Sequence, residues 1–225
     1  MSIQKKILLF SSLTALTLAG TALAAPVRGK IDVELRAVEI QDTPNHLRVR
    51  NGFIPTAEPQ VDLQRVLRVA ILREGAGSSS NGAAGCGAEL RGGALFPATL
   101  IASPGASLSV QNRDGTSYHL SAETIDGLSA EPLAAGHVLE FSAPEEPGDH
   151  LIRDAYYTHL SGQLVVIEDL VDCAEVDADG SFRFESIDPG EYTVRVFLHG
   201  EAVHDTSLIV PPYGSQTITL PPLAL

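Results

Sequence analysis

Two cysteines, Cys86 and Cys173, are the only thiols in the chain of 225 residues. As thiolates they could ligate a soft metal ion, and as a pair in an oxidising compartment they would form a disulfide. No histidine stands within four residues of either cysteine, whereas metal sites are usually marked by clustered ligands. Ligation by these thiols is therefore disfavoured, and the disulfide depends on whether the chain is exported.

The N-terminus has the order of segments that is typical of a secretory signal peptide. Two lysines precede an apolar stretch over residues 7–19, and small residues follow at 22–24. Several Ser and Thr residues interrupt the apolar stretch, which is shorter than the roughly 20 apolar residues of a membrane span. We predict that residues 1–24 are a signal peptide rather than a membrane anchor, that the mature protein is periplasmic or secreted, and that the two cysteines form a disulfide.

Serine and histidine occur near one another at Ser117 and His119 and at Ser161 and His159, and such pairs could supply a nucleophile and a base. The chain has no Gly-x-Ser-x-Gly segment, which forms the nucleophile elbow of many hydrolases. It also has no glycine-rich phosphate loop followed by Lys and Ser or Thr. The sequence therefore predicts a protein that is not an enzyme.

Acidic residues outnumber basic ones, with 28 Asp and Glu against 15 Lys and Arg and a formal net charge of -13. Nucleic acids and anionic membranes bind first through basic side chains, so both are excluded as partners by this balance. A hydrophobic content of 44% is normal for a folded protein with a packed core. We expect a periplasmic protein or a small ligand as the partner, and no membrane span after signal cleavage.

Apolar and polar residues alternate in several segments of the mature chain, which predicts β-strands with one buried face. The clearest examples are residues 107–111, 192–198 and 217–220. Asp-Gly and Pro-Gly pairs between such segments indicate tight turns. The pattern predicts an all-β sandwich. Residues 63–71 fit a helix and a strand equally well, and that alternative stays open.

A set of short motifs follows in a fixed order through the middle of the chain. The set consists of Phe96-Pro97, Pro104-Gly105, Gln111-Asn112-Arg113-Asp114, Tyr118-His119, Val138-Leu139-Glu140-Phe141, Pro147-Gly148-Asp149, Ile152-Arg153-Asp154 and Gly162-Gln163-Leu164-Val165-Val166. This order resembles the plastocyanin-like, or cupredoxin, family, in which a strand ending in Asn-x-Asp is followed by a histidine. The resemblance implies a Greek-key β-sandwich over residues 86–170.

Two later segments, residues 175–184 and 187–196, resemble the carboxypeptidase-regulatory-like β-sandwich, which is Ig-like. We expect that sandwich over residues 171–225, with N-terminal strands and loops over residues 25–85. The combination is similar to the periplasmic plastocyanin-like proteins often labelled methylamine-utilisation proteins. The resemblance implies that the first strands belong with the C-terminal module, so that the cupredoxin-like domain is inserted between two halves of the second sandwich.

The chain departs from the cupredoxin pattern in the loop that carries the copper ligands. When the family loop is aligned on Gly162, Asp154 takes the place of the cysteine, Tyr157 that of the second histidine and Leu160 that of the axial methionine. Only His119 keeps its residue type. A blue-copper site needs a thiolate and two imidazoles, so the resemblance implies a degenerate site.

His119, Asp154 and His159 could still offer two imidazoles and a carboxylate, a set suited to Zn(II) or to a non-blue Cu(II) site. The alternative is that His119 is a packed, hydrogen-bonded residue, with Tyr156 and Tyr157 filling the former copper pocket. We therefore expect no cofactor, with copper or zinc as the alternative. The predicted function is non-catalytic binding in the periplasm through this loop surface, and the alternative is copper binding or electron transfer.

Overall fold

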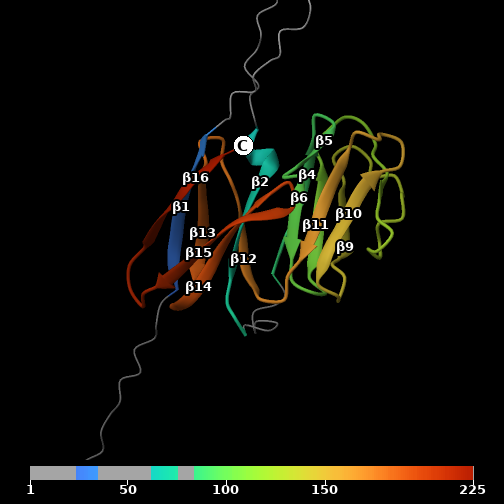
Figure 1. Cartoon of the computed structure of the whole chain (residues 1–225). Coiled ribbons are helices and arrows are strands. Elements are labelled where there is room, and N and C mark those ends of the chain that lie inside the picture. Colours follow the sequence, from blue (N-terminus) through green and yellow to red (C-terminus); the bar gives the residue numbers. More distant parts are fainter. Residues whose placement is uncertain (1–23, 35–61, 76–83, 225) are drawn as a thin grey trace, which may run out of the picture.

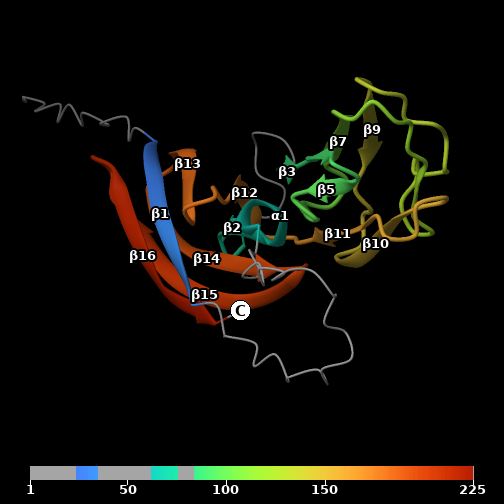
Figure 2. The same ribbon diagram turned by 90° about the horizontal axis from the view of Figure 1, so that it is seen from above.

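The computed structural model describes residues 24–34, 62–75 and 84–224, which are almost entirely β-strands. The predicted signal peptide lies outside this part of the chain except for Ala24. Four sheets are present among the described residues, and they form two β-sandwiches that lie side by side (Figures 1 and 2). The predicted all-β sandwich architecture is confirmed.

The first sandwich, here called the terminal sandwich, is built from strands near both ends of the chain. Its sheet A contains, in order, β13 (Ser181–Ile187), β1 (Ala25–Glu34) and β16 (Gln216–Ala224). Its sheet B contains, in order, β12 (Leu170–Glu175), β2 (Leu67–Leu72), β14 (Gly190–Leu198) and β15 (Glu201–Val210). Apolar side chains of both sheets pack into one shared core, which includes Val27, Val69 and Phe184.

The second, or central, sandwich is formed by the residues between β2 and β12. Its sheet C contains, in order, β3 (Gly85–Cys86), β6 (Thr99–Ala102), β11 (Ser161–Val166), β10 (Gly148–Asp154) and β8 (Leu120–Ser121). Its sheet D contains, in order, β5 (Ala94–Phe96), β4 (Ala88–Arg91), β7 (Ser107–Asn112) and β9 (Val138–Ser142). A separate core fills the space between these two sheets, with Leu90, Leu100 and Ile152 among its members.

The central sandwich is inserted in the terminal one. Strand β1 pairs with β13 and β16, and strand β2 pairs with β12 and β14. Both N-terminal strands therefore lie in sheets with strands that follow residue 169. The chain leaves the terminal sandwich after β2, completes the central sandwich, and returns at β12.

The stretch that fitted both a helix and a strand contains one of each. A single helical turn, α1 (Leu63–Val66), leads directly into β2. All six residues of β2 are buried, because Leu67, Val69 and Ile71 face the core of the terminal sandwich while Ala70 and Leu72 face the central sandwich. A strand buried on both faces shows no apolar alternation, which is why periodicity could not identify it.

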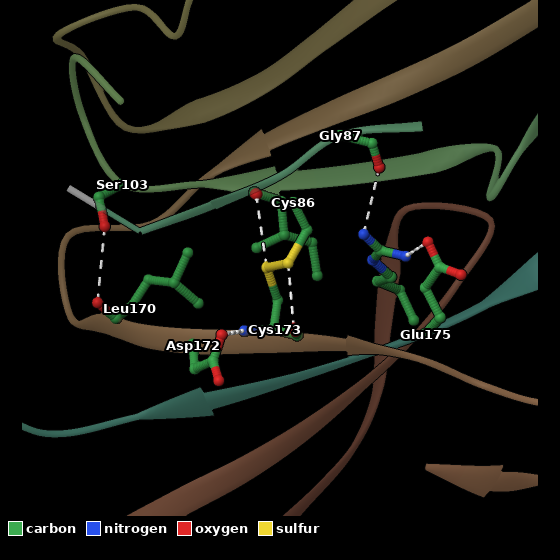
Figure 3. Close-up of a disulfide and its surroundings, with 9 residues drawn as sticks. Cys86, Gly87, Ser103, Leu170, Asp172, Cys173 and Glu175 are labelled. Atoms are coloured by element: carbon green, nitrogen blue, oxygen red, sulfur yellow. Dashed lines mark hydrogen bonds and ion pairs between the residues drawn. A yellow bond between two sulfur atoms is a disulfide. The ribbon is translucent and has the colours of Figure 1, made fainter. Parts of the chain in front are cut away.

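A small apolar interface joins the two sandwiches. It consists of Ala70, Leu72, Ile101, Val165, Leu170, Cys173 and Phe197, with Ala84, Cys86 and Ile167 at its margin. Cys86 of β3 and Cys173 of β12 form a disulfide across this interface, with their Cα atoms 6.1 Å apart (Figure 3). The predicted disulfide is confirmed, and it links the two sandwiches covalently. Among the described residues no helix is both long and apolar enough to cross a membrane.

Candidate functional site

Asp154, the last residue of β10, lies buried at one end of the central sandwich. Its Oδ2 atom accepts a hydrogen bond from the backbone N–H of His119 at 2.6 Å. Its Oδ1 atom accepts from the N–H groups of Tyr156 at 2.8 Å and Tyr157 at 2.7 Å. Burial raises the pKa of this carboxyl, but the three backbone hydrogen bonds outweigh burial and leave the pKa below its ordinary value. Asp154 is therefore held as a carboxylate.

Backbone hydrogen bonds close the loop that follows Asp154. The N–H of Ala155 donates to the carbonyl oxygen of His119 at 2.9 Å, and the N–H of Asp154 donates to that of Leu160 at 3.1 Å. The N–H of Leu160 donates to the carbonyl oxygen of Tyr157 at 2.8 Å. Leu160 is 1% exposed and packs in the core of the central sandwich, so the loop is anchored at its far end as well.

Aromatic rings gather on the outer side of this loop. We call His119, Tyr156, Tyr157 and His159 the tyrosine–histidine surface. Tyr156 is 72% exposed and Tyr157 is 38% exposed. The ring of His119 meets that of Tyr156 edge to face at 4.6 Å between centroids, and the rings of Tyr157 and His159 meet at 6.1 Å. Two large amphipathic rings are thus presented to solvent on a fixed backbone.

Tyr118 is a buried residue that packs against the tyrosine–histidine surface. It was not identified from the sequence as a site residue. Its hydroxyl donates to Oδ2 of Asp114 at 2.7 Å, and its buried ring packs edge to face against Tyr157 at 5.6 Å. Burial and the hydrogen bond to Asp114 raise the pKa of Tyr118 to about 12. Asp114 also accepts the N–H groups of Gly92 and Gly93 at 2.7 and 2.9 Å. The sequence signals were the Tyr118-His119 motif and the position of Asp114 shortly after a strand and before a glycine.

The donors near His119 do not fit a blue-copper ion. The carboxylate of Asp154, which the sequence resemblance aligns with a cupredoxin's copper-binding cysteine, is bound on both oxygens by backbone N–H groups. Leu160, in the place of the methionine, offers no donor atom and is buried. Nδ1 of His119 is buried without a hydrogen-bond partner, so one imidazole nitrogen keeps the capacity to bind a metal ion. One imidazole without a thiolate does not hold copper in a blue site.

The alternative metal set of His119, Asp154 and His159 is only partly brought together. Asp154 contacts His119 through the backbone N–H and not through the imidazole ring. The three side chains do not place their ligand atoms within 4.8 Å of one another; across the described ranges, only Cys86, Asp172 and Cys173 form such a group of three. The two sulfurs of that group are joined in the disulfide and are not thiolate ligands.

Comparison with solved structures finds copper proteins that are similar to about a third of the chain. Amicyanin from Paracoccus versutus is 9% identical, with 36% of this chain and 80% of that chain covered and a TM-score of 0.32. A P52G mutant of amicyanin in its reduced Cu(I) form is 11% identical, with 36% and 81% covered and a TM-score of 0.33. The copper-containing nitrite reductase of Thermus scotoductus SA-01 is 15% identical, with 38% and 23% covered and a TM-score of 0.33. At these TM-scores the similarities carry no conclusion about function. No family model and no curated protein matches the chain.

Proposed function

We propose that this chain is a non-catalytic binding protein that is exported to the periplasm and contacts a protein or a small ligand through its tyrosine–histidine surface. The observation that carries the proposal is the exposure of Tyr156 and Tyr157 on a loop whose backbone is fixed by Asp154. Tyrosine rings supply large amphipathic contact area with few side-chain torsions to immobilise, so they are favoured at recognition surfaces. A loop held by a rigid sandwich loses little entropy on binding.

Within this proposal the central sandwich is a cupredoxin-like domain that has lost its copper site. Support comes from the order of motifs between residues 96 and 168 and from strand pairing that hairpins alone cannot produce. Strand β4 runs parallel to β7, and β11 runs parallel to β6, as in Greek-key sandwiches. The terminal sandwich would be the carboxypeptidase-regulatory-like, Ig-like module. The disulfide supports export, because such bonds persist mainly in oxidising compartments.

The alternative function, copper binding at a non-blue site, has one favourable observation in the unpartnered Nδ1 of His119. Against it, the carboxylate of Asp154 already accepts three backbone hydrogen bonds, which involve both of its oxygens. Titration of the purified mature protein with Cu(II) separates the two functions. The binding proposal expects no stoichiometric copper and no thiolate-to-copper absorption band. Stoichiometric Cu(II) that is lost with His119→Ala would replace the binding proposal by the copper alternative.

Site-specific photo-crosslinking tests the binding proposal directly. A photoreactive phenylalanine analogue is placed at position 156 and, as the matched control, at position 213, because Tyr213 is 77% exposed but lies on the terminal sandwich. In the native host, light-dependent adducts of defined mass are expected from position 156 and not from position 213. Equal labelling from both positions, or none from position 156, would contradict the proposed surface.

A further inference from the structure

Arg68 of β2 is a charged residue with 2% side-chain exposure, and it lies at the junction of the two sandwiches. It points to the same side of β2 as Ala70 and Leu72, which is the side that faces the central sandwich. A charge is buried only at a large cost in solvation unless its donors are all paired.

The guanidinium of Arg68 has only two contacts for its donor groups among the described residues. Nη2 donates to the carbonyl oxygen of Gly87 at 3.2 Å. Nη1 forms an ion pair with Oε1 of Glu175 at a distance of 3.2 Å. Neither Nη1 nor Nε makes a hydrogen bond of acceptable geometry. Burial lowers the pKa of Arg68, and the charge of Glu175 offsets this only in part. The buried cation is thus left with unused donors.

A cavity of about 390 Å³ opens beside this guanidinium, between β2 and β12 on one side and β4 and β7 on the other. Ser109 and Gln111 lie on its wall, and the disulfide contributes apolar surface. Figure 3 shows the disulfide, Gly87 and Glu175 around this junction. The volume lies in the range of small-ligand pockets, which often form where two modules meet.

The counter-charge of Arg68 is weak. The side chain of Glu175 is 69% exposed, so it can rotate into solvent at little cost. Glu89, the other acidic residue on the cavity wall, is held by Arg113, whose Nη2 lies 2.9 Å from its Oε1. Asp172 does not line the cavity; its charge also favours the cationic form of Arg68, but burial raises the pKa of Asp172. One further carboxylate is tolerated here, whereas a dianion would meet the charges of Glu89 and Glu175.

We propose that this cavity binds a small monocarboxylate, whose oxygens take the place of Glu175 against Nη1 of Arg68 and pair with the second hydrogen of Nη2 beside it. The planar guanidinium matches a carboxylate with two parallel hydrogen bonds. Ser109 and Gln111 hold polar groups of the ligand, and the surface of the disulfide accepts a short alkyl chain. The site is built from elements other than those of the tyrosine–histidine surface and does not depend on the function proposed for that surface.

Titration of the oxidised, purified protein with sodium butyrate, followed by amide chemical shifts in NMR, tests the site. A second arm uses a tripeptide with a free C-terminal carboxylate and its amidated form, which distinguishes a peptide terminus from a free acid as the source of the carboxylate. We expect saturable shifts at Gly87 and Ser109 with butyrate or with the free tripeptide, and none with the amidated tripeptide.

Three variants make the test decisive. Glu175→Gln removes the competing carboxylate, and we expect binding to tighten by about tenfold. Arg68→Lys keeps the positive charge but loses the pair of parallel N–H donors, and we expect binding of the carboxylate to weaken by about tenfold. Glu185→Gln, at a carboxylate that is 75% exposed and paired with Arg183, is the matched control and should bind like the wild type. Since Arg68→Lys can fail to fold, Glu175→Gln decides: if it binds carboxylate no more tightly than the wild type, the proposal is overturned.

Discussion

The side chain of Asp154 accepts the backbone N–H of His119 at 2.6 Å, so a carboxylate at the end of β10 joins that strand to the segment just before β8. Its other oxygen accepts two further N–H groups, those of Tyr156 and Tyr157. A carboxylate with three backbone donors orders a loop in the same way as a bound ion, because it fixes the directions of several peptide groups at once. Hydrogen bonds within the chain therefore hold the backbone of the tyrosine–histidine surface.

Replacing this carboxylate by an amide tests its role. Asp154→Asn keeps the volume of the side chain, but its NH₂ group faces N–H donors, so at least one backbone donor loses its acceptor. We expect the free energy of unfolding to fall by about 2 to 3 kcal/mol, because hydrogen bonds to charged groups are the strong ones. Urea unfolding of the variant measures the change. Asp149→Asn, at an exposed position on the same strand, should leave the urea midpoint unchanged; equal midpoints for the two variants would contradict the role of Asp154.

The same carboxylate makes stability depend on pH in the acid range. Its folded-state pKa lies below the unfolded value of about 3.9, so the unfolded chain binds the proton more tightly. The stabilisation is complete above the unfolded pKa and is lost as the pH falls through the folded pKa. We expect the difference in unfolding free energy between wild type and Asp154→Asn to shrink steadily below about pH 4. A difference that stays constant down to pH 2 would show that Asp154 does not titrate in this way.

Most of the fold was predictable from the sequence. The features that could not be predicted are those buried between the two sandwiches. Strands with one solvent-facing side, such as β7 and β14, show clear alternation and were found from the sequence. Strand β2 is buried on both sides, so its pattern was ambiguous. Arg68 could not be placed either, since a charged residue in a strand normally marks the solvent face. Here that face meets a second sandwich.

The candidate site was predictable in its residues but not in its contacts. Asp154, Tyr156 and Tyr157 were expected in one loop near His119, and in the structure the Asp154 carboxylate accepts the backbone N–H groups of His119, Tyr156 and Tyr157. The sequence offered Asp154 as a metal ligand, because side-chain chemistry alone cannot distinguish an ion from backbone N–H groups as the partner. The partners of a carboxylate are set by the backbone path of the loop, which periodicity and spacing do not determine.

Tyr118 gives a second test of the support beneath the surface. Burial and the hydrogen bond to Asp114 raise its pKa to about 12, so its neutral form stabilises the fold below the unfolded pKa and this contribution is lost as the pH rises through about 12. Tyr118→Phe should cost about 1 kcal/mol at neutral pH. It should also remove the highest phenolate transition from an absorbance titration at alkaline pH. Tyr213→Phe, at an exposed ring, is the control and should leave that transition in place.

The disulfide should contribute to stability and also to the cooperativity between the sandwiches. It closes a loop of 87 residues, for which the chain-entropy model gives about 4 to 5 kcal/mol. Each sandwich has its own core, and the apolar interface between them is small. Without the covalent link, one sandwich can unfold while the other stays folded. We therefore expect the double variant Cys86→Ala, Cys173→Ala to unfold in two steps in urea, while the oxidised wild type unfolds in one. Wild type treated with reductant should match the variant, and a single transition with an unchanged midpoint in both would show that the interface alone couples the two cores.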